Sequence, residues 1–207
     1  MICDYLDDKD KLKQKIIEQK FDVIITSYGG SCSNAIEGRL RRSGFNIRYG
    51  KTKEEKSVCL WRNILCHSPY YIDLGKPYIY IYDNDIIKAF LSVKRRGGNY
   101  WAVNQRKLNN KKKLKLSDEN LLKSMIQQFY NFTEIKRKDV LIMKSSELFQ
   151  PEIKEKINNF LGRKVNGFPI EYREPTINTS THEYSQQEIE LFDKYKKDIE
   201  YIKNFEN

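Results

Sequence analysis

The chain alternates between short apolar runs and longer segments with spaced apolar residues. Runs of β-branched and aromatic residues predict strands at residues 21–26, 58–66, 78–82 and 139–143. Segments in which apolar residues recur every three or four positions predict helices. These begin with a helix within residues 1–20 and continue at residues 35–40, 86–93, 118–130, 151–161 and 185–205.

Polar residues at the predicted helix ends support these boundaries. Ser117 precedes one helix, and Ser185 begins a capping box with Glu188 at the start of the last. Any residue of the segment 83–85, Asp-Asn-Asp, can cap the helix that follows the strand at 78–82. Pro151 and Gly162 mark the beginning and end of a further helix.

The order of these elements predicts an α/β fold. Strands that alternate with helices pair in parallel and are covered by helices on both faces. We find no internal repeat and no domain boundary in the 207 residues, so we expect a single domain over residues 1–207.

Charge and composition narrow the class of protein. Lys and Arg number 38 and Asp and Glu 28, a net charge of +10 that favours an anionic partner. Such a partner is a phosphorylated or sulfated small molecule, a nucleic acid or a membrane surface. No run reaches the ~20 apolar residues of a membrane helix and the N-terminus is acidic, so we expect a soluble, cytoplasmic protein without a membrane partner. The four cysteines are scattered, which predicts free thiols rather than disulfides or structural zinc.

The first candidate site is the loop after the strand at 21–26. Ligands of open parallel sheets bind at the carboxyl ends of the strands. Gly29 and Gly30 permit close approach of the backbone, and Ser31, Ser33 and Asn34 place polar groups at a helix N-terminus, where phosphate is favoured. A tight turn with a polar cap is the alternative interpretation. The loop lacks the Gly-Lys-Ser/Thr ending of a Walker loop, which argues against an ordinary nucleoside triphosphatase.

Two further sets of residues carry candidate chemistry. His67 follows a predicted strand, where an imidazole could deprotonate an acceptor hydroxyl near neutral pH. A partly buried structural histidine is the alternative, and His182 lies in a polar stretch typical of a surface. Ser92, Arg95 and Arg96 lie within a helical turn of one another and could converge on a phosphate, unless the arginines are simply solvated. No sequence signature of nucleic-acid binding accompanies them, so that partner is not favoured.

In this order, the segments resemble the P-loop sulfotransferase family, which transfers a sulfonyl group from 3′-phosphoadenosine 5′-phosphosulfate to a hydroxyl or amine. Residues 24–34, IITSYGGSCSN, resemble the first strand and the 5′-phosphosulfate loop, commonly T-Y-P-K-S-G-T-T. Residues 65–69, LCHSP, resemble the K-T-H-x-P segment of the catalytic histidine. Residues 80–92 are similar to the strand and helix of the 3′-phosphate site, and residues 140–148 to a late strand and its turn.

The resemblance implies a three-layer α/β/α P-loop NTPase-like fold with a central parallel sheet. It also implies that His67 is the general base, that the donor or its product 3′-phosphoadenosine 5′-phosphate binds without a metal, and that a small molecule or carbohydrate accepts the sulfonyl group. The implied donor site contains Gly29, Gly30, Ser31, Cys32, Ser33, Asn34, Ser92, Arg95, Arg96 and Arg173.

The chain departs from the family pattern at three positions. Gly30 stands where a loop lysine or arginine contacts the transferred group, Cys32 replaces a loop glycine, and Asp83 lies near the expected 3′-phosphate arginine. Without that loop cation, three alternatives are open. Another residue supplies the charge that stabilises the transition state, the donor differs, or the protein no longer catalyses. The candidates for the first are Arg39, Arg95, Arg96 and Arg173.

Two other functions stay open. One is a non-catalytic protein of the same fold that binds a polyanion or a nucleotide through its basic face. The other is a small-molecule kinase that uses the same loop for ATP, which the missing Lys-Ser/Thr pair disfavours.

Overall fold

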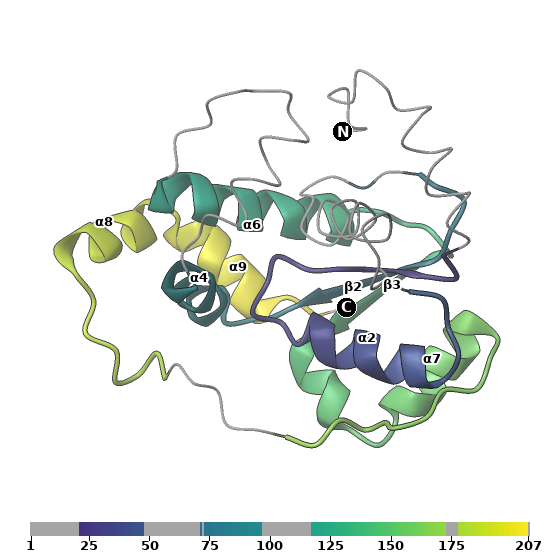
Figure 1. Ribbon diagram of the computed structural model, residues 1–207. Helices are drawn as coiled ribbons and strands as arrows, with labels where there is room; N and C mark the ends of the chain where they lie inside the picture. Colours follow the sequence, from purple (N-terminus) through teal and green to yellow (C-terminus); the bar gives the residue numbers. More distant parts are fainter. Residues whose placement is uncertain (1–20, 48–70, 72, 97–116, 173–177, 207) are drawn as a thin grey trace, which may run out of the picture.

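A small parallel sheet lies at the centre of the fold (Figure 1). The computed structural model describes residues 21–47, 71, 73–96, 117–172 and 178–206. Within these ranges β1 (Ile24–Thr26), β2 (Tyr78–Tyr82) and β3 (Val140–Lys144) form a three-stranded sheet in the order β1-β2-β3. Both pairings are parallel, with Thr26 beside Tyr80 and Tyr80 beside Ile142. The expected α/β class with a parallel sheet is therefore confirmed.

The central strand β2 divides the core into an aromatic and an aliphatic face. Its sequence, Tyr-Ile-Tyr-Ile-Tyr, is buried at all five positions. Since successive side chains of a strand point to opposite faces, Tyr78, Tyr80 and Tyr82 belong to one hydrophobic cluster and Ile79 and Ile81 to the other.

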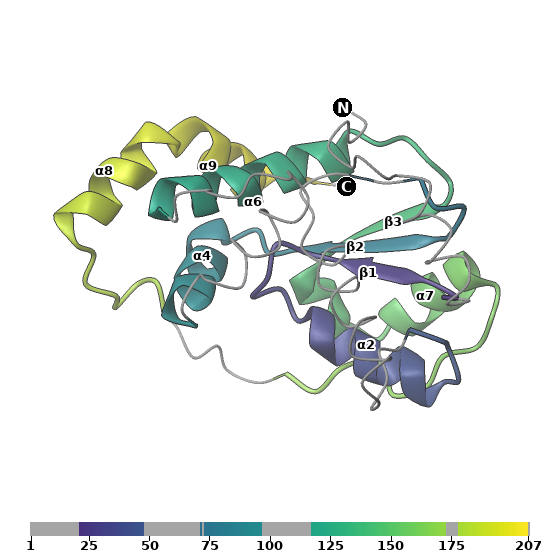
Figure 2. The ribbon, with the colours of Figure 1, turned by 45° about the horizontal axis from the view of Figure 1, so that its top comes forward.

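Helices cover both faces of the sheet (Figure 2). The aromatic face packs against α4 (Ile86–Arg95), α6 (Asp118–Thr133) and α9 (Lys196–Asn204), with Phe129 and Phe132 among the contacts. The aliphatic face packs against α2 (Ser33–Arg42) and α7 (Ile153–Leu161). Because β2 is sandwiched in this way, chemistry at its carboxyl end is held by a rigid support.

Local capping signals place the helix ends as expected. The side chains of Asp85, Ser117 and Ser185 each accept a hydrogen bond from a backbone N–H in the first turn of α4, α6 and α8 (Gln186–Lys194). Gly162 ends α7 with the left-handed backbone that glycine tolerates, at φ 62°. A short 3₁₀ helix, η1 (Ser145–Phe149), follows β3.

The C-terminal segment is two helices, which corrects the single helix expected over residues 185–205. The backbone leaves helical geometry at Tyr195, between α8 and α9, where ψ is 18°. The Tyr195 hydroxyl donates to the Glu119 carboxylate of α6 at 3.1 Å, and the Lys194 ammonium also contacts that carboxylate. This anchor fixes the junction, and α9 then continues with Ile202 fully buried in the core.

Several expectations fall outside the described residues. These are the helix within residues 1–20, the strand at 58–66, the candidate base His67 and the candidate ligand Arg173.

Candidate functional site

The loop between β1 and α2 turns sharply with three residues in the left-handed region. The φ angles of Gly29, Gly30 and Cys32 are 91°, 74° and 60°. Ser27 Oγ accepts the Gly29 N–H at 3.3 Å, and Ser31 Oγ donates to the Gly29 carbonyl at 3.3 Å. Ser31 was predicted to present its hydroxyl to a donor, yet the residue is buried and that hydroxyl shapes the turn.

Gly30 leaves no room for a side chain because α4 lies directly against the loop. A Cβ at this position would lie 3.0 Å from the Ala89 Cα, a distance that real Cβ atoms essentially never fall below. The left-handed φ adds a second constraint, since residues with a Cβ are strained there. Packing and backbone conformation together therefore disfavour a side chain at Gly30.

The loop ends at the N-terminus of α2, which has no side-chain cap. Cys32 occupies the N-cap position of α2 but makes no capping hydrogen bond, and the first turn contains no acidic residue. Ser33 is partly exposed and Asn34 exposed. The partial positive charge of a helix N-terminus is therefore not offset by a carboxylate of its own first turn, which is the local arrangement that anions favour.

Asp83 joins the loops after all three strands. The Tyr28 hydroxyl, after β1, donates to the Asp83 carbonyl and accepts the Asp83 N–H at 2.7 Å. The Asp83 carboxylate pairs with Lys88 Nζ of α4 at 2.9 Å and accepts from Ser145 Oγ, after β3, at 3.1 Å. We call Tyr28, Asp83, Lys88 and Ser145 the strand-end network.

The strand-end network is buried except for Lys88. Tyr28 is fully buried, Asp83 and Ser145 nearly so, and the Lys88 side chain is 27% exposed. Burial raises the pKa of Tyr28 well above its ordinary value, so the phenol stays neutral and can donate. Asp83 was noted in the sequence as a departure from a phosphate-binding arginine, and the structure gives it the task of holding the three strand ends together.

Lys88 is a cation that acts at the loop and that sequence reasoning missed. Burial raises the pKa of the Cys32 thiol, Asp83 raises it further and Lys88 opposes this, so both charges act at the loop. An ammonium has three N–H donors and Asp83 occupies one of them. The spacing of Lys88, Ser92 and Arg96, four residues apart on a helix, is the sequence signal that could have revealed it.

The structure separates the three residues expected to hold a second phosphate. Arg96 donates to Ser92, with Nη2 3.3 Å from Oγ and Nε 3.0 Å from the carbonyl oxygen. Arg95 instead lines a different hollow together with His182. Arg39, a candidate for the missing loop cation, donates from Nε to the Gly167 carbonyl at 3.0 Å, in the last turn of α2 and away from the loop.

Neither a metal site nor a membrane span is found in the part of the chain that the structure describes. No three His, Cys, Asp or Glu side chains there come close enough together to hold an ion. None of the helices in these ranges is both long and apolar enough to cross a bilayer.

The chain was compared with protein-family models, with curated proteins and with solved structures, and none of the three comparisons found a match.

Proposed function

We propose that the protein is a sulfotransferase-like enzyme that binds 3′-phosphoadenosine 5′-phosphosulfate at the N-terminus of α2. One observation carries the proposal: the left-handed loop of Gly29, Gly30 and Cys32 leads from a buried parallel strand into an uncapped helix N-terminus beside Lys88. Loops of this kind cradle phosphate and sulfate groups. The helices on both faces of the sheet are consistent with the three-layer P-loop architecture that forms part of the proposal.

The proposed roles follow from which groups the fold leaves available. The Ser33 backbone N–H and hydroxyl, at the start of α2, bind the 5′-phosphosulfate. The free N–H groups of Lys88 take the place of the absent loop lysine. Ser92 and Arg96, already in contact, bind the 3′-phosphate. Asp83 does not contact the sulfonyl donor. Its carboxylate positions the Lys88 ammonium.

The proposed reaction is an in-line displacement at sulfur. The acceptor oxygen forms a bond to sulfur as the bond from sulfur to the bridging phosphate oxygen breaks, and 3′-phosphoadenosine 5′-phosphate leaves. The acceptor proton passes to the general base, for which His67 is proposed on the sequence resemblance. Lys88 and the α2 N-terminus stabilise the charge that develops on the bridging oxygen.

A second candidate function is polyanion binding without catalysis. Arg163, after α7, donates from Nη2 to the carbonyls of Ser43 and Gly44, after α2, at 3.3 and 3.1 Å. This contact brings the ends of α2 and α7 together, where Arg41, Arg42 and Lys164 are exposed. A basic surface of this kind suits a sulfated glycan or nucleic acid.

Calorimetric titration with 3′-phosphoadenosine 5′-phosphate, without metal, tests the donor site. Asn34→Asp adds a negative charge in the first turn of α2, which stabilises a helix and repels an anion. Asn120→Asp makes the same change in the first turn of α6 and is the matched control. We expect micromolar binding to the wild type and to Asn120→Asp, and at least about tenfold weaker binding to Asn34→Asp.

Two results would overturn the proposal. One is the absence of heat with the wild-type protein, and the other is equal affinity of the wild type and Asn34→Asp. Retention on a heparin column that falls in an Arg41→Ala and Arg42→Ala double variant, together with no heat, would favour the polyanion function instead.

A further inference from the structure

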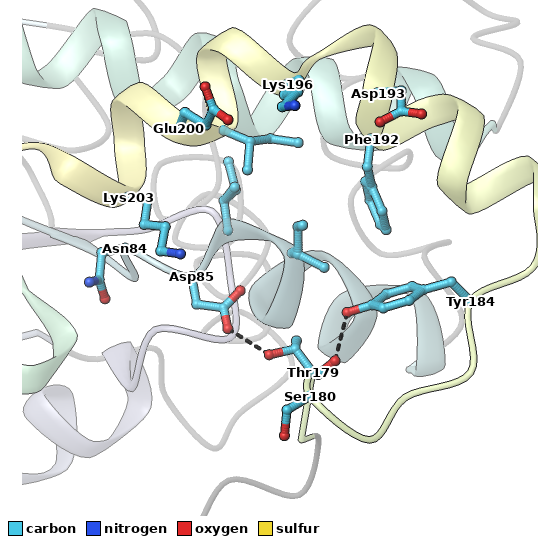
Figure 3. A pocket seen from close by; sticks show the side chains of 13 residues that line it. Asn84, Asp85, Thr179, Ser180, Tyr184, Phe192, Asp193, Lys196, Glu200 and Lys203 are labelled. Atoms are coloured by element: carbon cyan, nitrogen blue, oxygen red, sulfur yellow. Dashed lines mark hydrogen bonds between the residues drawn. The ribbon is translucent and has the colours of Figure 1, made fainter.

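A cavity lies beside the start of α4 (Figure 3). It has a volume of about 480 Å³, within the range of about 300 to 1,000 Å³ typical of ligand pockets. Ile86 and Ile87 at the start of α4 form one wall, α8 and α9 a second, and the segment 179–184 a third. We call this cavity the α4–α9 pocket.

The interior of the α4–α9 pocket is apolar and held in a fixed arrangement. Phe192 and Tyr184 pack edge to face with their ring centroids 5.7 Å apart. The Tyr184 hydroxyl donates to the Thr179 carbonyl at 3.0 Å, which fixes the tyrosine ring at the pocket wall. Ile87 and Ile199 line the same space. These surfaces suit a flat ring of a ligand.

One end of the pocket is polar and retains an uncommitted cation. Figure 3 shows the Lys203 ammonium directed toward Asp85, and Asn84 lines the same end of the pocket. The Asp85 carboxylate already has two hydrogen-bond partners. One oxygen accepts the backbone N–H of Lys88 at 2.9 Å, and the other accepts the Thr179 hydroxyl at 3.0 Å. Among the described residues, neither Lys203 nor the Asn84 side chain has a hydrogen-bond or ion-pair partner.

The other charged residues of the pocket lie along α8 and α9. They are Asp193, Lys196 and Glu200. All three are exposed, and Figure 3 shows the Glu200 carboxylate directed away from Asn84 and Asp85. An ammonium and a carboxamide therefore meet a ligand at the polar end, beside the Asp85 carboxylate, and both can donate to an anion.

We propose that the α4–α9 pocket binds a small aromatic carboxylate. Its ring packs between Ile87 and the pair of Phe192 and Tyr184, and its carboxylate accepts from Lys203 Nζ and the Asn84 amide. This site is separate from the proposed donor site, because none of Lys88, Ser92 and Arg96 lines the pocket. Its existence does not depend on sulfonyl transfer.

Three naphthalene derivatives that share the ring and carry a negative, neutral or positive substituent test the proposal. The full-length protein is titrated by calorimetry with 2-naphthoate, neutral 2-naphthalenemethanol and cationic 2-naphthylmethylamine. We expect 2-naphthoate to bind with a Kd below about 1 mM and the other two about tenfold more weakly. Equal binding of all three, or no binding of 2-naphthoate at about 5 mM, would overturn the proposal.

Lys203→Met and Asn84→Asp test where the carboxylate binds, with Lys197→Met as the control. Lys203→Met removes the ammonium from an exposed position, and Lys197→Met makes the same change at an exposed position of α9 that does not line the pocket. We expect Lys203→Met to weaken 2-naphthoate binding about tenfold and Lys197→Met to leave it unchanged. Asn84→Asp, which adds a negative charge at the polar end, should weaken it as well. Unchanged binding by both Lys203→Met and Asn84→Asp would contradict the assigned site.

Discussion

The strand-end network and the α4–α9 pocket flank the same helix but use their polar groups differently. In the network, Asp83 binds Tyr28, Lys88 and Ser145 from three different segments, and Asp83 itself has little hydrogen-bonding capacity left over. In the pocket, the Lys203 ammonium is directed at the polar end without a partner in the described part of the chain. Groups of the first kind maintain the fold, and groups of the second kind are available to a ligand.

The largest expected effect comes from breaking the network at its centre. Asp83→Asn leaves Lys88 without its carboxylate and weakens the bond to Ser145, so we expect a loss of about 2 to 3 kcal/mol in the free energy of unfolding. Lys203→Met in the pocket should leave that free energy unchanged within experimental error. Urea unfolding of both variants checks the contrast, and equal stability of the two would show that Asp83 is not structural.

Close packing of the loop against α4 predicts the next largest effect. Gly30→Ala places a Cβ 3.0 Å from the Ala89 Cα at a φ of 74°. Gly75→Ala has a similar φ of 62° but no atom within 4 Å of the new Cβ. We expect losses of about 2 to 3 kcal/mol for Gly30→Ala and about 1 kcal/mol for Gly75→Ala, because only the former adds overpacking to backbone strain. Equal losses would contradict the contact between the loop and α4.

Gly30 and Asp83 show which features of the fold could be predicted from the sequence and which could not. β2 and the caps Ser117 and Ser185 were predicted correctly, and the cap of α4 was predicted to within residues 83–85, because hydrophobic alternation and capping are local signals. The roles of Gly30 and Asp83 were not predicted. The role of Gly30 depends on its contact with Ala89, and the role of Asp83 depends on its hydrogen bond with Ser145. Tertiary packing brings these partners together, and no local sequence pattern encodes it.

The pocket and the break at Tyr195 were missed for the same reason. Thr179 reaches Asp85 across 94 residues of sequence, and Lys194, at the end of α8, reaches Glu119 across 75. The helix pattern of residues 185–205 fits one straight helix as well as two. A regular stripe of apolar residues therefore predicts that a segment is helical. Where the segment bends depends on its contacts with a neighbouring helix.

A smaller, pH-dependent effect is expected where α8 meets α4. Burial raises the pKa of Glu188, but hydrogen bonds from Lys94 and Ser185 outweigh it and lower that pKa to about 2. A lowered pKa in the folded state stabilises the protein above the ordinary value of 4.5, and this stability is lost as the pH falls toward 2.

Unfolding in urea at pH 6 and pH 3 measures this contribution. We expect the wild type to lose about 1 kcal/mol more than Glu188→Gln between these two conditions, after solvent screening is allowed for. Glu190→Gln, an exposed neighbour on α8, is the control and should behave like the wild type. An identical pH dependence of the wild type and Glu188→Gln would show that the contact with Lys94 does not stabilise the fold.

The smallest expected effect on stability, and the sharpest on binding, belongs to Asn34. Asn34→Asp should raise the free energy of unfolding by about 0.3 to 1 kcal/mol while it repels an anionic donor. A gain in stability with a loss of affinity separates a binding role from a structural one. Thermal unfolding of Asn34→Asp and Asn120→Asp checks the first half, and a destabilised Asn34→Asp would contradict it.

The central claim is that an anionic donor binds at the α2 N-terminus, and backbone amide resonances test it most directly. The ¹⁵N-labelled protein is titrated with 3′-phosphoadenosine 5′-phosphate. We expect the amide resonances of Ser33 and Asn34 to shift until binding saturates, while those of Asn84 and Lys203 stay in place. Unmoved amides at Ser33 and Asn34, or shifts confined to Arg41, Arg42 and Lys164, would contradict it.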